Sequence, residues 1–480
     1  MANHSKKIGE KPERLHRGTG VRRPGEGVVV KDFFELRSKD TNVRREIVAG
    51  FTTFFTMAYI IFVNPDMLSL TGMSWGGVFF ATCLSATVGT LIMALFANVP
   101  YAVAPGMGLN AIFTYTVCLG AGFNWQEALA MVFICGVINI LITVTKLRKA
   151  IVKSIPMGLQ NAIGGAIGLF IAYLGMNNAG LITYGATPGM AAFNTPSVIL
   201  SLIGLFIMIV LMVLKVKGAI LIGIAAATVI GIPMGVTVLP RSIMSSGETV
   251  QGFRDVAFSF FGRSGFGSLF SHASQIPFVL ITIFSMSLAD TFDSIGTFIG
   301  TGRKSHIFDE EDEKALEGSG FKSRLDKALV ADSFATSIGA CLGTSNATTY
   351  VESAAGIAAG GRTGLTSLTT AVLFLLCLPF AGLFGMVPGA ATAPALIVVG
   401  ILMAEPFAEI DWKNFEEAVP AFFTVAVMSF TYGITNGIAA GFIMYCVVKL
   451  CTGKWKEIHP IIAVASILFI IDFVMKAVGA

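Results

Sequence analysis

Two short polar passages interrupt the apolar spans of this 480-residue chain at matching places in its two halves. Residues 101–110 read YAVAPGMGLN, and residues 343–356 read GTSNATTYVESAAG. Their starts are 242 residues apart (343 − 101), which is close to half of the chain. Non-helical backbone is tolerated at membrane depth only where it is buried in protein or lines a cavity. A matched pair of such breaks therefore predicts the binding site of a transporter.

The composition places the chain in a lipid bilayer. Apolar residues make up 54% of the chain and charged residues 13%, whereas soluble domains carry roughly 25% charged residues. Several stretches approach or reach the ~20 apolar residues that a spanning helix needs. These stretches are residues 78–96, 130–144, 198–214, 219–233, 368–384 and 460–474. We therefore expect a multi-pass membrane protein.

The placement of basic residues predicts the topology. Residues 1–47 hold 12 Lys/Arg and 7 Asp/Glu, a net charge of +5 (12 − 7). Beside a membrane span, such a tail is expected to stay in the cytoplasm rather than to bind nucleic acid. With the N-terminus inside, the basic loops 146–153 and 215–217 also fall on the cytoplasmic side, as the positive-inside rule requires.

The count of spans predicts an inverted repeat. We expect seven spans before residue 237 and seven between residues 276 and 450, and an odd number of spans inverts the second copy. The predicted fold is an all-α membrane protein with 14 transmembrane segments in two inverted seven-span repeats. Spans three and ten are expected to contain a short strand and a half-helix. The last apolar stretch, residues 460–477, does not fit this count, and it is an extra span, a re-entrant piece or a membrane-surface helix.

Neither cysteine nor histidine forms a catalytic or metal-binding pattern in the sequence. The seven cysteines lie in or beside apolar spans without CxxC spacing, as small apolar residues do. The five histidines fall outside the expected span interiors. We therefore expect no cofactor, no metal and no enzymatic activity.

Acidic residues inside the spans are the second functional signal. Asp290, Asp293, Asp332 and Glu352 fall in predicted spans, where no lysine or arginine clearly pairs with them. A carboxylate at the bilayer centre costs about 2.5–3.5 kcal/mol on insertion scales, so such groups normally face a cavity and carry protons or contact polar substrates. Asp332, near the expected start of its span, is predicted to be interfacial. Asp472 is expected to face a neighbouring helix or the surface.

Glu352 is the strongest candidate among these acids. The residues before it favour extended backbone and the small residues after it suit a packed helix, so it is expected in the first turn of a half-helix. The helix dipole there favours its charged form and desolvation opposes it, which predicts a group that titrates during transport. The alternative is a capping acid without a substrate role.

Asp290 and Asp293 are expected to share one helix face, because they are three residues apart. Structural bonding to a neighbouring helix is the alternative for each of them, and it is stronger for Asp290. Asn110 closes the first break after Gly106 and Gly108, where freed backbone amides can bind a ligand carbonyl. A tight helix crossing is the alternative for that passage.

At these residues the chain resembles the nucleobase–ascorbate, or nucleobase–cation symporter, superfamily. More narrowly, it is similar to the AzgA-like hypoxanthine/adenine/guanine permeases over roughly residues 33–455. The motifs that carry the resemblance are residues 49–65, 104–110, 290–297 and 343–364. Asp293 and Gly296 match the acid-x-x-Gly pattern of span eight in the superfamily, and Glu352 matches the acid of span ten. Uracil-type relatives carry Glu and a nearby His on span eight, where this chain has Asp293 and Thr297, so the resemblance does not extend to uracil specificity.

The resemblance implies a core domain and a gate domain that move against each other. The core comprises residues 47–147 with spans one to four and residues 276–384 with spans eight to eleven. The gate comprises residues 148–238 with spans five to seven and residues 385–452 with spans twelve to fourteen. The remaining parts are a cytoplasmic tail (1–46), an extracellular loop (239–275) and a C-terminal hydrophobic segment (453–480).

The resemblance also implies the function: proton-coupled import of purine bases across the cytoplasmic membrane by an elevator-like mechanism, in a homodimer. A purine presents ring N–H groups that carboxylates accept, and an aromatic side chain can stack on the base. We expect substrate contacts from Glu352, Asp293, Asn110, Thr349, Tyr350, Ser353, Phe292, Thr297 and Thr53. We expect Asp293, Glu352 and Asp290 to carry the proton. A sulfate-type anion carrier on a similar fold is the alternative, although it requires a positive site.

Overall fold

The computed structural model describes residues 33–145, 154–184, 188–238, 246–271, 275–305, 307–308 and 323–478. The described residues are mostly helical, and nine of their helical segments are long and apolar enough to cross a membrane. Three further apolar helices, Met107–Gly120, Ala219–Gly231 and Pro460–Ile471, are shorter. The predicted all-α membrane fold is confirmed, and the count of 14 spans stays a prediction.

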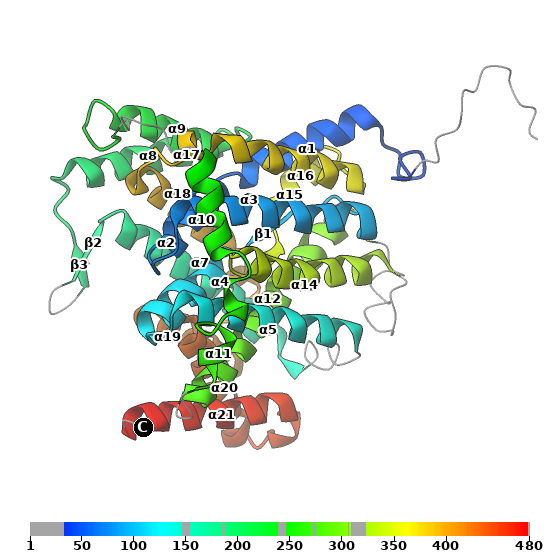
Figure 1. Ribbon diagram of the computed structural model, residues 1–480. Helices are drawn as coiled ribbons and strands as arrows, with labels where there is room; N and C mark the ends of the chain where they lie inside the picture. The colour runs from blue at the N-terminus through cyan, green and yellow to red at the C-terminus, as the bar shows by residue number, and fades with distance from the viewer. Residues whose placement is uncertain are drawn as a thin grey trace, which may run out of the picture.

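The first half of the chain contains two interruptions, one after α1 and one between η1 and α4 (Figure 1). Its elements are α1 (Val43–Met57), α2 (Ile60–Ser69), α3 (Trp75–Ile92), the π-helix η1 (Met93–Ala97), β1 (Val103–Pro105), α4 (Met107–Ala111), the π-helix η2 (Ile112–Gly120), α5 (Trp125–Val144), α7 (Met157–Asn178), β2 (Ile182–Tyr184), β3 (Pro188–Met190), α8 (Pro196–Val213) and α9 (Ala219–Gly231).

The second half contains the matching interruption between α14 and α15. Its elements are α10 (Ser246–Val256), η3 (Ser259–Phe261), α11 (Phe266–Leu269), α12 (Ile276–Ser305), α14 (Arg324–Leu342), β4 (Ala347–Thr349), α15 (Ser353–Ala358), α16 (Gly364–Cys377), η5 (Leu378–Phe380), α17 (Ala381–Phe384), α18 (Gly389–Met403), η6 (Glu405–Glu409), α19 (Phe415–Phe430), α20 (Ile434–Cys451), η7 (Trp455–Glu457) and α21 (Pro460–Val478).

The two predicted breaks meet as an antiparallel pair of strands. Strand β1 pairs with β4 in the register Val103↔Thr349, Ala104↔Thr348 and Pro105↔Ala347. All the residues of both strands are buried, so their backbone groups depend on each other for hydrogen bonds. A strand followed by a half-helix in each half confirms the predicted design of the breaks, and the pairing of the two strands is a further finding.

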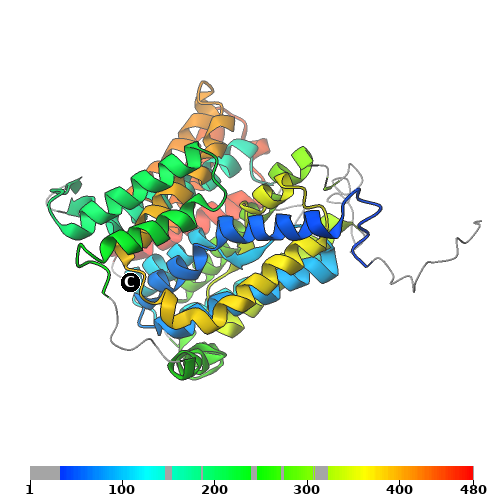
Figure 2. The same cartoon turned by 90° about the horizontal axis from the view of Figure 1, so that it is seen from above.

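Helix packing repeats between the two halves. Helices α1, α3 and α5 of the first half correspond to α12, α14 and α16 of the second. Helix α1 packs on α16 as α12 packs on α5, and α3 packs on α16 as α14 packs on α5. Figure 2 shows α1 in blue beside α16 in yellow. In a second set, α7, α8 and α9 correspond to α18, α19 and α20. Helix α8 packs on α9 as α19 packs on α20, and α7 packs on α19 as α18 packs on α8. This reciprocity is the signature of an inverted repeat.

Residues 239–275, predicted as a long extracellular loop, are more ordered than expected. Within the described part of this segment, α10, η3 and α11 form helical turns, and α10 packs along α3. The two helices approach at glycines: a Cβ added at Gly77 would lie 2.7 Å from the carbonyl carbon of Gly252. The abundance of glycine in this segment therefore serves close packing as well as turns.

The C-terminal stretch forms one uninterrupted helix, α21, rather than a re-entrant pair. It packs against α20 and α12. Ile462, Ala465 and Phe469 are buried in this contact, whereas Val464 and Ile467 on another face are each 57% exposed. Its placement as an extra span or as a membrane-surface helix stays a prediction.

Candidate functional site

Two half-helices begin at the paired strands in the middle of the molecule. Strand β1 leads through Gly106 into α4, and β4 leads through Glu352 into α15. The first amides of a helix lack partners within that helix and can bind a ligand acceptor. Glycine is needed at position 106, because a Cβ there would lie 2.8 Å from the Thr348 hydroxyl oxygen.

Glu352 lies directly before α15, at its N-cap position. It makes no capping hydrogen bond to the α15 backbone, which argues against the alternative of a capping acid. Instead it accepts a 2.6 Å hydrogen bond from the hydroxyl of Tyr59. The structure thus places Glu352 at the N-cap position, one residue before the first turn in which the sequence predicted it.

Tyr59 is a site residue that the sequence reasoning missed. It lies at the junction of α1 and α2, where the helix tightens: the amides of Ile61 and Phe62 bond the carbonyls three residues back. Pro65 lies further along, inside α2, where it lacks the N–H that would bond the carbonyl of Ile61. A tyrosine within an apolar span that also contains a proline is the signal that could have found it.

Tyr350 and Ser353 fasten one break to the other. The Tyr350 hydroxyl donates to the carbonyl of Pro105 at 2.5 Å, and its ring centroid lies 6.4 Å from that of Tyr59. The Ser353 hydroxyl accepts from the amide of Ala102 at 3.0 Å. Both residues therefore lie at the predicted site, with their polar atoms bonded to the backbone of the other half.

Asp293 and Asp290 lie on the same helix, α12, but bond to different neighbours. Asp293 accepts from the Thr348 hydroxyl of β4 at 3.2 Å and lies close enough to Glu352 for the two charges to interact. Asp290 instead accepts from Asn139 of α5 at 2.7 Å and from Thr336 of α14 at 3.1 Å. The structure thus directs Asp293 toward the strand pair and Asp290 into the helix packing behind it.

The expectation that Asp332 is interfacial is wrong. Helix α14 begins at Arg324, four residues before the predicted start of the span, so Asp332 lies more than two turns inside the helix and is buried. It accepts from Ser294 of α12 at 2.5 Å and from Thr349 of β4 at 2.7 Å. Asp332 therefore holds β4 against α14. Its partner in β4 is Thr349, which was predicted to contact substrate.

The other predicted contacts are buried in the framework of the site. The Asn110 side chain accepts from the Ser345 hydroxyl and is fully buried. The Thr53 hydroxyl oxygen packs against α15, where Gly356 leaves room for it. Thr297 is buried one turn after Asp293. Phe292 belongs to α12, but its side chain lies outside the described residues.

The site is acidic and has no compensating base among the described side chains. None of the ion pairs in the described part of the chain involves Asp290, Asp293 or Glu352. Tyr59, Tyr350, Asp293 and Glu352 lie within electrostatic reach of one another. Such a cluster can accept hydrogen bonds from a neutral ligand, and it disfavours an anion.

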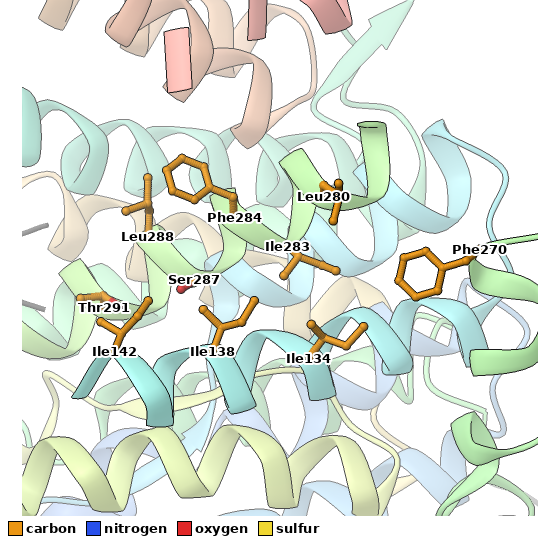
Figure 3. A pocket seen from close by; sticks show the side chains of 10 residues that line it. All are labelled: Ile134, Ile138, Ile142, Phe270, Leu280, Ile283, Phe284, Ser287, Leu288 and Thr291. Carbon is orange, nitrogen blue, oxygen red and sulfur yellow. The ribbon is translucent and has the colours of Figure 1, made fainter. Parts of the chain in front are cut away.

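An apolar cavity lies between α5 and α12 (Figure 3). Ile134, Ile138 and Ile142 of α5 face Leu280 and Phe284 of α12 across it. Its lining carries two hydroxyl side chains and no charged group. It offers few partners for the polar edge of a small heterocycle, so the paired half-helices remain the candidate site.

Comparisons with known proteins agree with this geometry. The model of a permease family, that of the xanthine/uracil permeases, matches residues 44–440. The adenine permease AdeP of Escherichia coli is 39% identical over 94% of this chain and 97% of its own length. The guanine/hypoxanthine permease PbuO of Bacillus subtilis is 41% identical over 92% of this chain and 99% of its own.

Solved structures show the same fold at low sequence identity. The transmembrane domain of the cyanobacterial bicarbonate transporter BicA matches with a TM-score of 0.56 and 15% identity, over 88% of this chain and 97% of that domain. SLC26A9 matches with a TM-score of 0.57 and 13% identity, over 85% of this chain and 66% of that protein. The chain therefore has the inverted-repeat fold of these transporters, and it belongs to the xanthine/uracil permease family, within the nucleobase–ascorbate superfamily.

Proposed function

We propose that this permease imports purine bases, namely hypoxanthine, guanine or adenine, across the cell membrane together with a proton. The observation that carries the proposal is the Glu352 carboxylate, which is held by Tyr59 at the start of α15 and opposite the β1–α4 corner. The names of the relatives support a purine substrate, because they are adenine and guanine/hypoxanthine permeases.

The chemistry of a purine suits this site. A neutral base presents ring N–H donors and a carbonyl or ring-nitrogen acceptor along its edge. Glu352 accepts from the N–H groups, and Asp293 provides a second acceptor nearby. The amides at the starts of α4 and α15 are suited to the acceptor atom of the base. Tyr350 offers an aromatic ring beside the carboxylates.

An elevator-like movement accounts for transport across the membrane. The proposed core consists of residues 47–147 and 276–384, and the proposed gate of residues 148–238 and 385–452. The packing of α1, α3, α5, α12, α14 and α16 on one another, and of α7, α8, α9, α18, α19 and α20 on one another, supports this division. The proposal also places the N-terminal tail in the cytoplasm and takes the protein to be a homodimer.

The alternative is anion transport, which is favoured by the fold alone, since the structural neighbours include a bicarbonate transporter and an anion transporter. An anion requires a positive site, whereas this one gathers carboxylates. Uptake of labelled purines and of labelled sulfate and bicarbonate into proteoliposomes distinguishes the two functions. Purine uptake that excess sulfate does not inhibit is the expected result.

Glu352→Gln is predicted to abolish purine uptake in a protein that still reaches the membrane. A hydrogen bond to a charged group contributes about 1.5–3 kcal/mol, so purine affinity should fall at least about tenfold. Glu127→Gln is the matched control, because Glu127 belongs to a capping box at the start of α5 in which glutamine also serves. Normal uptake by a well-expressed Glu352→Gln protein would contradict the binding role.

Asp293→Asn is predicted to reduce transport sharply, and Asp290→Asn to reduce it less. The reason is that Asp293 accepts from Thr348 in the strand that leads to Glu352, whereas Asp290 is bonded between α5 and α14. Equilibrium binding of a labelled purine to both purified variants provides the measurement. The assignment is reversed if the Asp290→Asn protein loses binding while the Asp293→Asn protein keeps it.

Uptake is predicted to follow a proton gradient and not a sodium gradient. Acids without basic partners can carry protons between the two faces of a membrane, and a base carried with a proton lowers the net charge of the site during the crossing. Purine accumulation in proteoliposomes should rise as external pH falls and should collapse with a protonophore. Accumulation that persists without a pH gradient and follows imposed sodium would show that the coupling ion is sodium.

A further inference from the structure

We propose that Tyr59 is a positioning residue for base recognition: its hydroxyl holds one oxygen of Glu352 and turns the other toward the ligand. This inference rests on the proposed function, because it assigns the means by which the same site presents its carboxylate to a purine. Nothing in the purine chemistry itself requires such a residue. The assignment comes from the contact between the α1–α2 junction and the start of α15.

The geometry of the contact is that of a strong, directed hydrogen bond. The Tyr59 hydroxyl oxygen and Glu352 Oε1 are 2.6 Å apart, in the range of a hydroxyl bonded to a carboxylate. In the described part of the chain, Glu352 Oε2 accepts no hydrogen bond from another side chain. One carboxylate oxygen is therefore held by Tyr59, and under the proposal the other oxygen accepts from a ring N–H of the base.

Tyr59 is itself held rigidly by both halves of the chain. Its side chain is 1% exposed, and the tightened turn before Pro65 fixes its backbone. Its ring lies against that of Tyr350, which in turn bonds Pro105 of the other break. A hydroxyl placed in this way limits the rotation of the Glu352 side chain, which lowers the entropy cost of binding a base.

The ionisable groups that face Glu352 come from three elements. They are Tyr59 at the α1–α2 junction, Tyr350 at the end of β4 and Asp293 of α12. Of these, Tyr59 alone donates a hydrogen bond to the Glu352 side chain among the described residues. A carboxylate that loses its donor takes up a proton more readily, so the pH dependence of purine binding reports directly on this contact.

Tyr59→Phe tests the proposal, because it removes one oxygen atom and keeps the ring. Tyr445→Phe is the matched control: Tyr445 of α20 is also buried, and its hydroxyl donates to the carbonyl of Glu457 at 3.5 Å, away from the paired strands. Hypoxanthine binding to the purified full-length proteins is measured across a pH series, together with the melting temperature. The loss of a hydrogen bond to a charged group should weaken hypoxanthine binding by about tenfold or more in Tyr59→Phe.

The pH midpoint of hypoxanthine binding should also move toward alkaline pH by about one unit in Tyr59→Phe and stay in place in Tyr445→Phe. If Tyr59→Phe does not fold, replacement of Tyr59 by a ring-fluorinated tyrosine keeps the shape and donates a stronger hydrogen bond, and it should move the midpoint toward acidic pH. An unchanged midpoint in whichever of these variants folds overturns the proposal, even where affinity falls. A wild-type protein that binds no purine overturns the proposed function instead.

Discussion

Backbone groups that leave a helix inside a membrane protein must find hydrogen bonds within the protein, because lipid offers none. Here each half of the chain provides hydrogen-bond partners for the interrupted backbone of the other half. Strand β1 and strand β4 pair, and the side chains of Tyr350 and Ser353 bond the backbone of Pro105 and Ala102 in the first break. The two half-helices can therefore begin in the middle of the molecule, and the rest of the site is arranged around their starts.

The same constraint explains why the buried acids differ in the number of hydrogen bonds that they accept. A carboxylate at membrane depth is costly, so each one is either bonded by several neighbours or set where a ligand can reach it. Asp332 and Asp290 are of the first kind, since each accepts two side-chain hydrogen bonds from the surrounding helices and β4. Glu352 and Asp293 each accept only one in the described part of the chain. This difference, rather than acidity alone, supports the proposal that Glu352 and Asp293 face the ligand.

The repeat, the breaks and the position of Glu352 could be predicted from the sequence, because glycine, proline and polar residues within apolar spans are tolerated only where protein or a cavity surrounds them. The roles that depend on helix register could not. Hydropathy placed Asp332 near a span end, whereas α14 begins earlier, at Arg324. Thr349 was expected to contact substrate, but its hydroxyl is bonded to Asp332. The role of Tyr59 could not be predicted because its partner, Glu352, is 293 residues away along the chain.

A structure of the protein with bound hypoxanthine tests the central claim most directly. The account predicts density for the base between the β1–α4 and β4–α15 corners, with a ring N–H within hydrogen-bond distance of Glu352 and the Tyr59 contact intact. Density for the base in the apolar cavity between α5 and α12, or a base at the strand pair that contacts neither Glu352 nor Asp293, would contradict it.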